Sequence, residues 1–380
     1  MAKKAYIGVD GVARKIKKGY IGVGGVARKI KKAYIGIGGV ARPCWGSSNY
    51  FGTITDLSTK AVGLGATDVT LSNGSKSALF VAGQKIDAYD DLLTKSSPPA
   101  PSNHGSDLAA ATNNWAIFAG GGSYAVGRTA VDAYGNSLTK TSATELSVGR
   151  RYLAAAGKRY YKAVFAGGED ASGASVTAVD AYDTSLTRST PDGLSESRGE
   201  LAAAVAGNYY VFAGGRVQST TLSASVDAYN NSLTKSTPTA LPHPTRSNAA
   251  TTIGNYALFG GGYSFPTGQR PTAMVVSYNN SLTQSIQTDL SVSRQSLAAT
   301  TLAVTTTEQY ALFGGGKDSN GYSGAVDVYD MSLTRTVFDD MSAGRSDLGA
   351  TTTKSYVLFG GGRDTSGYSA TVDVYAPSHK

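Results

Sequence analysis

Arginine and aspartate recur at fixed places along this chain, and they are the residues most able to do chemistry. An arginine closes a Leu-Ser-x-x-Arg motif, or a variant of it, at Arg150, Arg198, Arg246, Arg294 and Arg345. An aspartate occupies a Val-Asp-x-Tyr motif at Asp132, Asp180, Asp227, Asp327 and Asp373. These arginines could hold an anion, but a residue that nearly every repeat requires has, in general, a structural role. We therefore expect them to bind strand carbonyls or the recurring aspartates.

Three loops carry an aspartate followed three residues later by a glycine, at residues 170–173, 318–321 and 364–367. A calcium loop needs six or more oxygen ligands, usually from several carboxylates, and each of these loops offers one carboxylate. An Asp-x-x-Gly turn explains the pattern more simply. We expect turns, with calcium at Asp318 as the alternative.

Other catalytic and metal-binding patterns are sparse. The three histidines, His104, His243 and His379, are far apart, and Cys44 is the single cysteine. Copper and zinc need clustered nitrogen or sulfur ligands. No Gly-x-Ser-x-Gly elbow or phosphate loop occurs, and no residue pattern points to the facing carboxylates of a glycosidase. We expect no catalytic residue, no metal and no cofactor.

Two landmarks repeat along most of the chain and indicate which elements position these residues. A tyrosine ends the Val-Asp-x-Tyr motif or a variant at intervals of 45 to 51 residues, and an apolar stretch with a glycine run precedes each one. The tyrosines are Tyr89, Tyr134, Tyr182, Tyr229, Tyr278, Tyr329 and Tyr375. The phenylalanines of the apolar stretches are Phe80, Phe118, Phe165, Phe212, Phe259, Phe313 and Phe359. A period in the forties with strand-like residues is typical of a β-propeller.

Each unit is expected to supply four strands. In one unit these are residues 201–204, 209–212, 225–229 and 232–236. The alanine-rich first segment suits an innermost strand, where the sheets crowd the axis. Glycines after the second segment permit a sharp exit of the chain.

The two ends of the repeat region complement each other. The last unit ends at Tyr375, with only five residues after it, and so lacks a fourth strand. A strand-like segment at residues 50–55 has no unit of its own and aligns with the missing strand. Strands from both ends would then close the ring and remove free sheet edges. We therefore expect an all-β, seven-bladed propeller over residues 46–380.

These motifs resemble the kelch family over about residues 46–380. The matching features are the glycine doublet after the second strand, the Val-Asp-x-Tyr strand and the arginine of Leu-Ser-x-x-Arg. The chain departs from the family at the fourth-strand tryptophan, where it has the leucine of Ser-Leu-Thr, at Leu138, Leu186, Leu233, Leu282 and Leu333. The resemblance implies a kelch-like propeller fold. Galactose-oxidase-like enzymes share that architecture, but their copper-binding histidines and tyrosines have no visible counterpart here.

The connection between the second and third strands varies most among the units, while the connection between the third and fourth hardly changes. Connections of the first kind should share one face of the ring with those that join successive units. Tyrosine and arginine on adaptable loops are typical of recognition surfaces. The alternative is that such side chains merely solvate the rim. The candidate ligand-binding residues are Tyr124, Arg128, Arg216, Tyr263, Phe265, Arg270, Tyr322, Arg363 and Tyr368.

Residues 1–45 form a separate basic arm with a repeat of 14 residues. Residue pairs 10–11, 24–25 and 38–39 are Asp-Gly or Gly-Gly, which favour two-residue hairpin turns, so the arm is expected to be three hairpins or a meander. It holds eleven Lys or Arg and one acid, whereas the rest holds 24 basic residues (35 less 11) and 26 acidic ones (27 less 1). The candidate anchoring residues are Tyr6, Arg14, Tyr20, Arg28, Tyr34 and Arg42.

Two interpretations compete for the charge of the arm. It could contact phosphates of nucleic acid or membrane, or it could be a solvated β-ribbon that docks by strand addition. We favour docking and expect no nucleic acid partner. The arm is similar to short Tyr-Ile-Gly-Val-x-Gly-Val-Ala-Arg repeats at the start of tail and other structural proteins from bacteriophages of Gram-positive hosts.

No apolar run is long enough to span a bilayer, and no apolar segment follows the N-terminal lysines as in a secretory signal. Together these observations predict a non-enzymatic structural and adhesion protein of a virion or phage-like particle, made in the bacterial cytoplasm without a signal peptide. The arm would attach it to other particle proteins, in one or several copies. The propeller would bind a host cell-surface carbohydrate or protein. The alternatives are an intracellular kelch-type interaction scaffold and a glycan-acting propeller enzyme.

Overall fold

The computed structural model describes residues 49–123, 126–218, 221–264 and 270–376, together with the backbone of six strands before residue 46. Those six strands pair as three antiparallel hairpins. They are β1 (Ala5–Val9) with β2 (Val12–Ile16), β3 (Tyr20–Val23) with β4 (Val26–Lys29), and β5 (Ala33–Ile37) with β6 (Val40–Trp45). The hairpin prediction for the arm is thus confirmed, whereas the turn pairs lie outside the described residues.

The rest of the described chain is all-β and forms small antiparallel sheets of four strands in a propeller-like arrangement. The first sheet contains β8 (Gly65–Thr70), β9 (Lys76–Ala82), β10 (Lys85–Tyr89) and β11 (Lys95–Ser96). The second contains β12 (Ser106–Thr112), β13 (Ala116–Ser123), β15 (Val131–Tyr134) and β16 (Lys140–Ser142), with β14 (Val126–Gly127) paired to β13. The third contains β17 (Ala154–Gly157), β18 (Ala163–Ala166), β19 (Val179–Tyr182) and β20 (Arg188–Ser189).

Four further sheets continue the series. The next contains β21 (Ala202–Ala206), β22 (Tyr209–Ala213), β23 (Val226–Asn230) and β24 (Lys235–Ser236). It is followed by β26 (Ala249–Ile253), β27 (Tyr256–Gly260), β30 (Val275–Tyr278) and β31 (Gln284–Gln287). Then come β32 (Ala298–Ala303), β33 (Gln309–Gly314), β34 (Val326–Asp330) and β35 (Arg335–Phe338). The last sheet contains β36 (Gly349–Thr352), β37 (Val357–Gly360), β40 (Val372–Tyr375) and β7 (Tyr50–Ile54).

Two small groups of strands lie in the connections. They are the three-stranded set β25 (Thr245–Arg246), β28 (Tyr263–Ser264) and β29 (Arg270–Pro271), and the pair β38 (Arg363–Asp364) and β39 (Gly367–Tyr368). No helix in the described part of the chain is long and apolar enough to cross a membrane.

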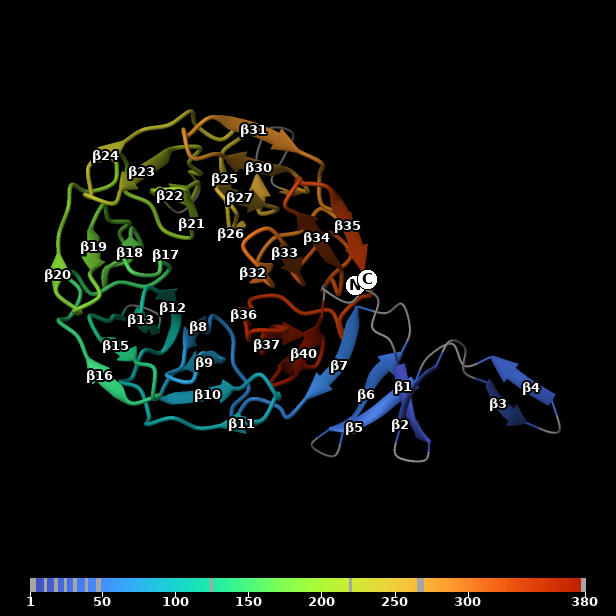
Figure 1. The fold of residues 1–380 in the computed structure, drawn as a ribbon. Helices are drawn as coiled ribbons and strands as arrows, with labels where there is room; N and C mark the ends of the chain where they lie inside the picture. Colours follow the sequence, from blue (N-terminus) through green and yellow to red (C-terminus); the bar gives the residue numbers. More distant parts are fainter. Residues whose placement is uncertain are drawn as a thin grey trace.

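The sheets surround a common centre, with the first strand of each nearest the axis (Figure 1). These inner strands contact one another in the order β8, β12, β17, β21, β26, β32, β36 and again β8. A narrow axial space of about 310 Å³ is lined largely by their alanines, among them Ala109, Ala154, Ala202 and Ala249. Small side chains let the inner strands approach closely, as the sequence predicts.

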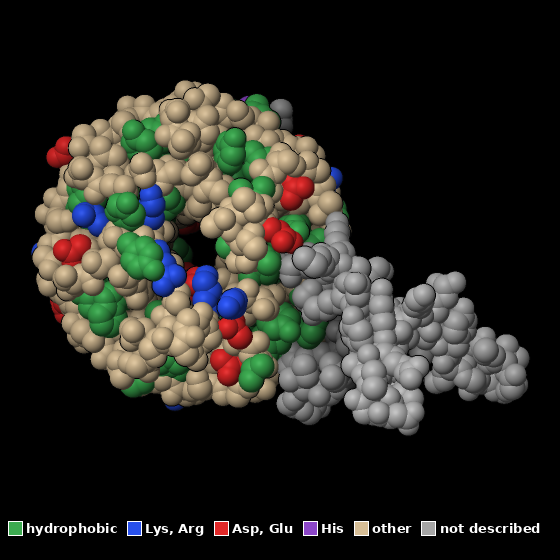
Figure 2. Space-filling view, in the orientation of Figure 1, with side chains coloured by type: hydrophobic (Ala, Val, Ile, Leu, Met, Phe, Trp, Pro, Cys, Tyr) green, Lys and Arg blue, Asp and Glu red, His purple; other side chains and the backbone are tan. Residues whose placement is uncertain are grey.

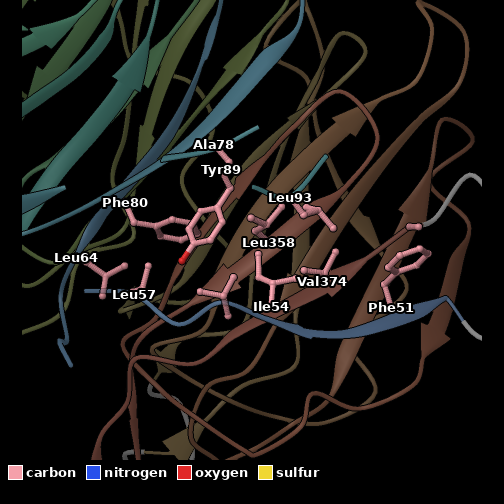
Figure 3. Packing of buried hydrophobic residues seen from close by; sticks show 12 residues of the cluster. Phe51, Ile54, Leu57, Leu64, Ala78, Phe80, Tyr89, Leu93, Leu358 and Val374 are labelled. Atoms are coloured by element: carbon pink, nitrogen blue, oxygen red, sulfur yellow. The ribbon is translucent and has the colours of Figure 1, made fainter. Parts of the chain in front are cut away.

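The last sheet is completed by β7, which comes from the other end of the repeat region. β7 pairs with β40, and Ile54 lies opposite Val372. Phe51 and Ile54 of β7 pack with Leu358 and Val374 of the same sheet against side chains of the first sheet, including Phe80 (Figure 3). The predicted fourth-strand role of residues 50–55 is therefore confirmed.

The fourth strands are shorter than predicted. Residues 232–234 were expected to begin a strand, but β24 starts at Lys235. Leu233 has a φ of 65°, and the Asn230 side chain accepts hydrogen bonds from the amides of Ser232 and Thr234. A side-chain acceptor of this kind builds a turn in place of a strand. The recurring Ser-Leu-Thr segment is thus a turn, so its leucines do not lie in the fourth strand as predicted.

The recurring arginines are buried and bind the recurring aspartates. The ion pairs Arg150–Asp180, Arg198–Asp227, Arg294–Asp327 and Arg345–Asp373 join atoms 2.5 to 2.9 Å apart, and all eight side chains are fully buried. Each arginine also donates to a backbone carbonyl, on a strand for Arg150, Arg198 and Arg294 and just after β37, at Gly361, for Arg345. The predicted structural role is confirmed for these four residues.

The fifth arginine, Arg246, was assigned to this set wrongly. Thr245 holds the equivalent position, because its carbonyl accepts from Gly215 as the Arg198 carbonyl accepts from Gly168. The same unit has Val276 opposite Phe259, where other units have the aspartate. Arginine and aspartate are therefore absent together, as expected when either charge alone would be buried without a partner.

Histidine takes the arginine's place in another unit. His104 is fully buried, and its two ring nitrogens face the Gly120 carbonyl at 2.9 Å and an Asp132 carboxylate oxygen at 3.0 Å. Asp132 also pairs with Lys140 at 3.3 Å. Histidine thus holds the position of the arginine beside the aspartate in this unit.

Each repeat also carries the same aromatic anchor. Phenylalanine and tyrosine rings meet edge to face, as in the pair Phe212–Tyr229 with centroids 6.1 Å apart. The tyrosine hydroxyl donates to a backbone carbonyl in the segment before the unit, as Tyr278 does to Thr239 at 2.7 Å. Burial raises the pKa of Tyr278 to about 12. The ring therefore stays neutral and ties the unit to the preceding connection.

The role of the buried ion pair can be tested by replacing Arg198 and Asp227 with threonine and valine. These are the residues that the next unit has at the equivalent positions, Thr245 and Val276. Arg198→Thr and Asp227→Val should each lower the free energy of unfolding by about 3–5 kcal/mol, because each leaves one buried charge unpaired. The double variant should lose much less than the sum of the two. Urea unfolding of the four proteins measures the coupling, and additive losses would contradict a paired role.

Candidate binding site at the axial mouth

The variable loops and the connections between units meet on one face of the molecule. Isolated backbone bridges join them at Arg151–Glu169, Gly199–Arg216, Gln295–Lys317 and Ser346–Arg363. In each bridge, the residue named first lies in the connection before an inner strand. Its partner lies in the connection that follows the next strand of a sheet. The expectation that these two kinds of connection share one face is therefore confirmed.

A cycle of backbone hydrogen bonds runs around the centre of this face. Each amide in the cycle donates to the carbonyl of the corresponding residue in the preceding unit, over 2.7 to 3.1 Å. The cycle passes through Gly63, Asp107, Tyr152, Glu200, Ser247, Ser296 and Asp347, and returns to Gly63. All seven have φ between 52° and 59°.

This left-handed conformation is costly for residues other than glycine. The hydrogen bonds of the cycle hold these residues in the left-handed conformation. As a consequence their side chains are held at the centre of this face.

The cycle borders a cavity of about 460 Å³ at the axis. Its polar lining comes from the cycle itself and from the residues beside it. These polar residues are Asp107, Tyr152, Glu200, Arg246, Ser247, Asn248, Gln295, Ser296, Lys317, Ser346 and Asp347. Leucines just before the inner strands, such as Leu153 and Leu201, form its floor. We call this cavity and its lining the axial mouth.

Alternating charges stiffen one side of the axial mouth. Glu169 binds both Arg151 and Arg216, and Glu200 binds both Arg216, at 3.1 Å, and Arg246, at 2.6 Å. The carboxylates are nearly buried, with side-chain exposures of 5% for Glu169 and 14% for Glu200. A network of this kind is worth more than isolated surface pairs, and it leaves little net charge on this side.

Burial raises the pKa of the Asp107 carboxyl group, although Ser106 donates a hydrogen bond to it. It also raises the pKa of Tyr152 to about 12. The mouth thus offers carboxyl, phenol, amide and cationic groups around a leucine floor. That combination suits a polar ligand with several hydroxyl groups and an apolar face.

Only part of the predicted ligand-binding set lies beside the mouth. Arg216 borders it through Glu200, Tyr263 lies under the Arg246 guanidinium, and Tyr322 lies under Lys317. Arg128, Arg270, Arg363 and Tyr368 do not line the cavity, and Tyr368 is 54% exposed on β39. Tyr124 and Phe265 lie outside the described residues. A binding role for any of these side chains stays a prediction.

The predicted anchoring residues are placed only as strand positions. Arg14, Arg28 and Arg42 lie opposite Ile7, Ile21 and Ile35 in equivalent registers of the three hairpins. Tyr6, Tyr20 and Tyr34 each precede one of these isoleucines. The side chains of all six lie outside what the structure describes.

The residues missed at the mouth include Tyr152, Glu200 and Arg246. A signal for them was present in the sequence. Alignment of the repeats on their Leu-Ser-x-x-Arg motifs places Tyr152, Glu200 and Asp347 two residues after the arginine, and these differ although their surroundings repeat. A variable residue between two repeated ones is a better pointer to a site than the recurring arginine.

The three aspartate loops are turns, as expected. Asp170 accepts from the Ser172 amide at 2.8 Å, Asp318 from the Asn320 amide at 2.6 Å, and Asp364 from the Ser366 amide at 2.7 Å. Among the described residues no group of three or more His, Cys, Asp or Glu is arranged to hold a metal ion.

Comparison with known proteins adds information on the fold. No protein-family model matches the chain, and no curated protein matches it. The solved structure of a protein called YjhT is similar, with a TM-score of 0.55 and 12% identity, over 75% of this chain and 99% of that chain. At this identity the likeness concerns the fold alone.

The charge network at the mouth can be tested by removing its most buried acid. Glu169→Ala should lower the free energy of unfolding by about 2–3 kcal/mol, because two partly buried arginines lose their shared partner. Glu169→Gln, which keeps an acceptor oxygen, should cost less. The exposed Glu145→Ala serves as control and should change stability by less than about 0.5 kcal/mol. Equal losses in urea unfolding for Glu169→Ala and Glu145→Ala would contradict the network.

Proposed function

We propose that this chain is a non-enzymatic structural and adhesion protein of a bacteriophage or phage-like particle, such as a tail component. In this proposal the four-stranded sheets are the seven blades of a closed, kelch-like propeller. Residues 1–45 attach the chain to other particle proteins. The face with the axial mouth binds a carbohydrate or protein on the surface of the host cell.

The proposal rests on the contrast between the buried residues that repeat in the units and the residues at the axial mouth, which differ between units. Buried Arg–Asp pairs and Phe–Tyr pairs repeat from unit to unit. The side chains at the mouth differ from unit to unit, as Tyr152, Glu200 and Asp347 illustrate. A rigid repeated scaffold with individual side chains on one face is typical of a recognition protein.

The role of the arm is supported by its charge and its hairpins. The basic residues are concentrated before residue 46, and short two-stranded ribbons are marginal alone. Pairing with a larger assembly would stabilise the exposed strand edges. Such an arm serves attachment, and the nearly neutral remainder serves recognition.

Deletion of residues 1–45 tests the attachment role. The shortened chain should keep the thermal stability of the repeat region, because β7 and the sheets are intact. It should be missing from purified particles when it replaces the full chain during assembly. Normal incorporation of the shortened chain would contradict the proposal, as would a shortened chain that fails to fold.

Binding at the mouth is tested with the full chain on arrays of bacterial surface glycans and on host cells. Lys317→Ala should weaken binding about tenfold or more, since a charge-assisted hydrogen bond is lost. Lys354→Ala removes another exposed lysine, from a turn that does not line the mouth, and should bind as the unmodified chain does. Undiminished binding by Lys317→Ala, or turnover of a bound glycan, would contradict the proposal.

A further inference from the structure

Two polar cavities lie away from the mouth, over the turns that join first to second strands and third to fourth strands. We call the surface formed by these turns the turn face. The larger cavity, of about 760 Å³, is lined by Gly157, Lys158, Arg159, Val205, Gly207, Asn208, Tyr209, Asn230, Asn231, Ser232, Thr252, Gly254, Asn255 and Asn280. The smaller, of about 450 Å³, is lined by Asp68, Thr70, Leu71, Ser72, Lys76, Thr112, Asn113, Asn114, Asn136, Arg159 and Tyr160.

Arg159 lines both cavities, so the two are neighbours along one surface. Its guanidinium stacks on the ring of Tyr160, 4.8 Å from the centroid, and Tyr160 is 67% exposed. An extended chain molecule could therefore cross Arg159 and occupy both cavities. A compact ligand would fill only one.

The larger cavity contains cations without acids. Lys158 donates to the Gly207 carbonyl at 2.9 Å and to the Asn208 side chain at 2.7 Å, and it lies over the Tyr161 ring. In the described part of the chain neither Lys158 nor Arg159 forms an ion pair with a carboxylate. The mouth differs, because there Glu169 and Glu200 pair with Arg151, Arg216 and Arg246. The larger cavity thus retains positive charge for a ligand.

Amide side chains provide the rest of its polar lining. Asn208 and Asn255 occupy the same turn of successive units, and Asn280 follows from the next turn along the surface. All three are exposed. A side-chain amide both donates and accepts hydrogen bonds, as pairs of sugar hydroxyl groups require. Tyr160 and Tyr161 add aromatic faces on which a sugar ring can pack.

We propose that the turn face binds an anionic polysaccharide, with Arg159 and Lys158 at its acidic groups and the asparagines at its hydroxyl groups. The acidic group is a carboxylate, as in a uronic acid polymer, or a phosphodiester, as in a polyol phosphate polymer. Lys76 of the smaller cavity is held by Asp68 at 2.9 Å, which leaves the excess positive charge near Arg159. Lys and Arg side chains lie close to the central opening in the view of Figure 2.

This site does not depend on the proposed function, because it uses other residues on another surface. A nucleic acid is disfavoured as the ligand, since two unpaired cations provide few phosphate contacts. In the larger cavity, asparagine side chains, which suit sugar hydroxyl groups, outnumber the cationic side chains. The test below nevertheless includes an oligonucleotide.

The experiment measures binding of fluorescein-labelled probes to the full chain by polarisation. The probes are an octamer of galacturonic acid, a glycerol phosphate octamer, neutral maltooctaose and a single-stranded DNA octamer. One of the two acidic glycan-type probes should bind, more weakly as salt rises, and the neutral probe should not. The probe that binds identifies carboxylate or phosphodiester as the acidic group.

Variants then place the site. Arg159→Ala should weaken binding about tenfold or more, and Tyr160→Ala should weaken it by a smaller factor. Lys354→Ala removes a lysine from the same kind of turn in the last unit, outside both cavities, and should leave binding unchanged. Lys317→Ala at the mouth should also leave it unchanged, which separates this site from the proposed host-binding face.

Several outcomes would overturn the inference. They are failure of both acidic probes to bind, equal binding of maltooctaose, tighter binding of the DNA, or equal affinity of Arg159→Ala and the unmodified chain. Because Arg159 is exposed, its replacement should not disturb folding, and an unchanged melting temperature verifies this.

Discussion

The backbone hydrogen bond from the Gly63 amide to the Asp347 carbonyl joins the first repeat to the last, over 3.1 Å. The remaining architecture depends on such contacts, because a four-stranded sheet has two apolar faces that only its neighbours can cover. The pairing of β7 with β40 serves the same end at the outer edge. Through these contacts the inner strands β36 and β8 of the last and first sheets also lie against each other.

The buried residues that recur in the units maintain this arrangement of sheets. The surface residues that differ between units are free to vary. Buried ion pairs bind four of the connecting segments to the sheets that follow them, and tyrosine hydroxyls of those sheets bind the same segments, as Tyr229 binds Asp192. Where one unit lacks the aspartate it also lacks the arginine, as Val276 and Thr245 show. Because these repeated contacts fix the backbone, an exposed residue such as Arg159 can change without altering the fold. Two chemically distinct surfaces can therefore coexist on one scaffold.

The sequence predicted the strands, the pairing of residues 50–55 and the shared face of the variable loops, because each follows from a strong periodic pattern. It did not predict that Leu233 lies in a turn, since the left-handed conformation there depends on the Asn230 side chain. It placed Arg246 with the buried arginines, although Arg246 lies one residue after the equivalent position, which Thr245 occupies. The cavities were not predictable, since their walls come from residues far apart in the chain, such as Lys158 and Asn280.

Hydrogen exchange of the amides in the backbone cycle tests the central claim most directly. If the first and last repeats are joined as described, Gly63 and the β7 amides that donate to β40 should exchange as slowly as Glu200 in the middle of the chain, through the same global opening. Exchange at these amides that is orders of magnitude faster than at Glu200 would contradict the account, since it would mean that the first and last repeats separate before the rest unfolds.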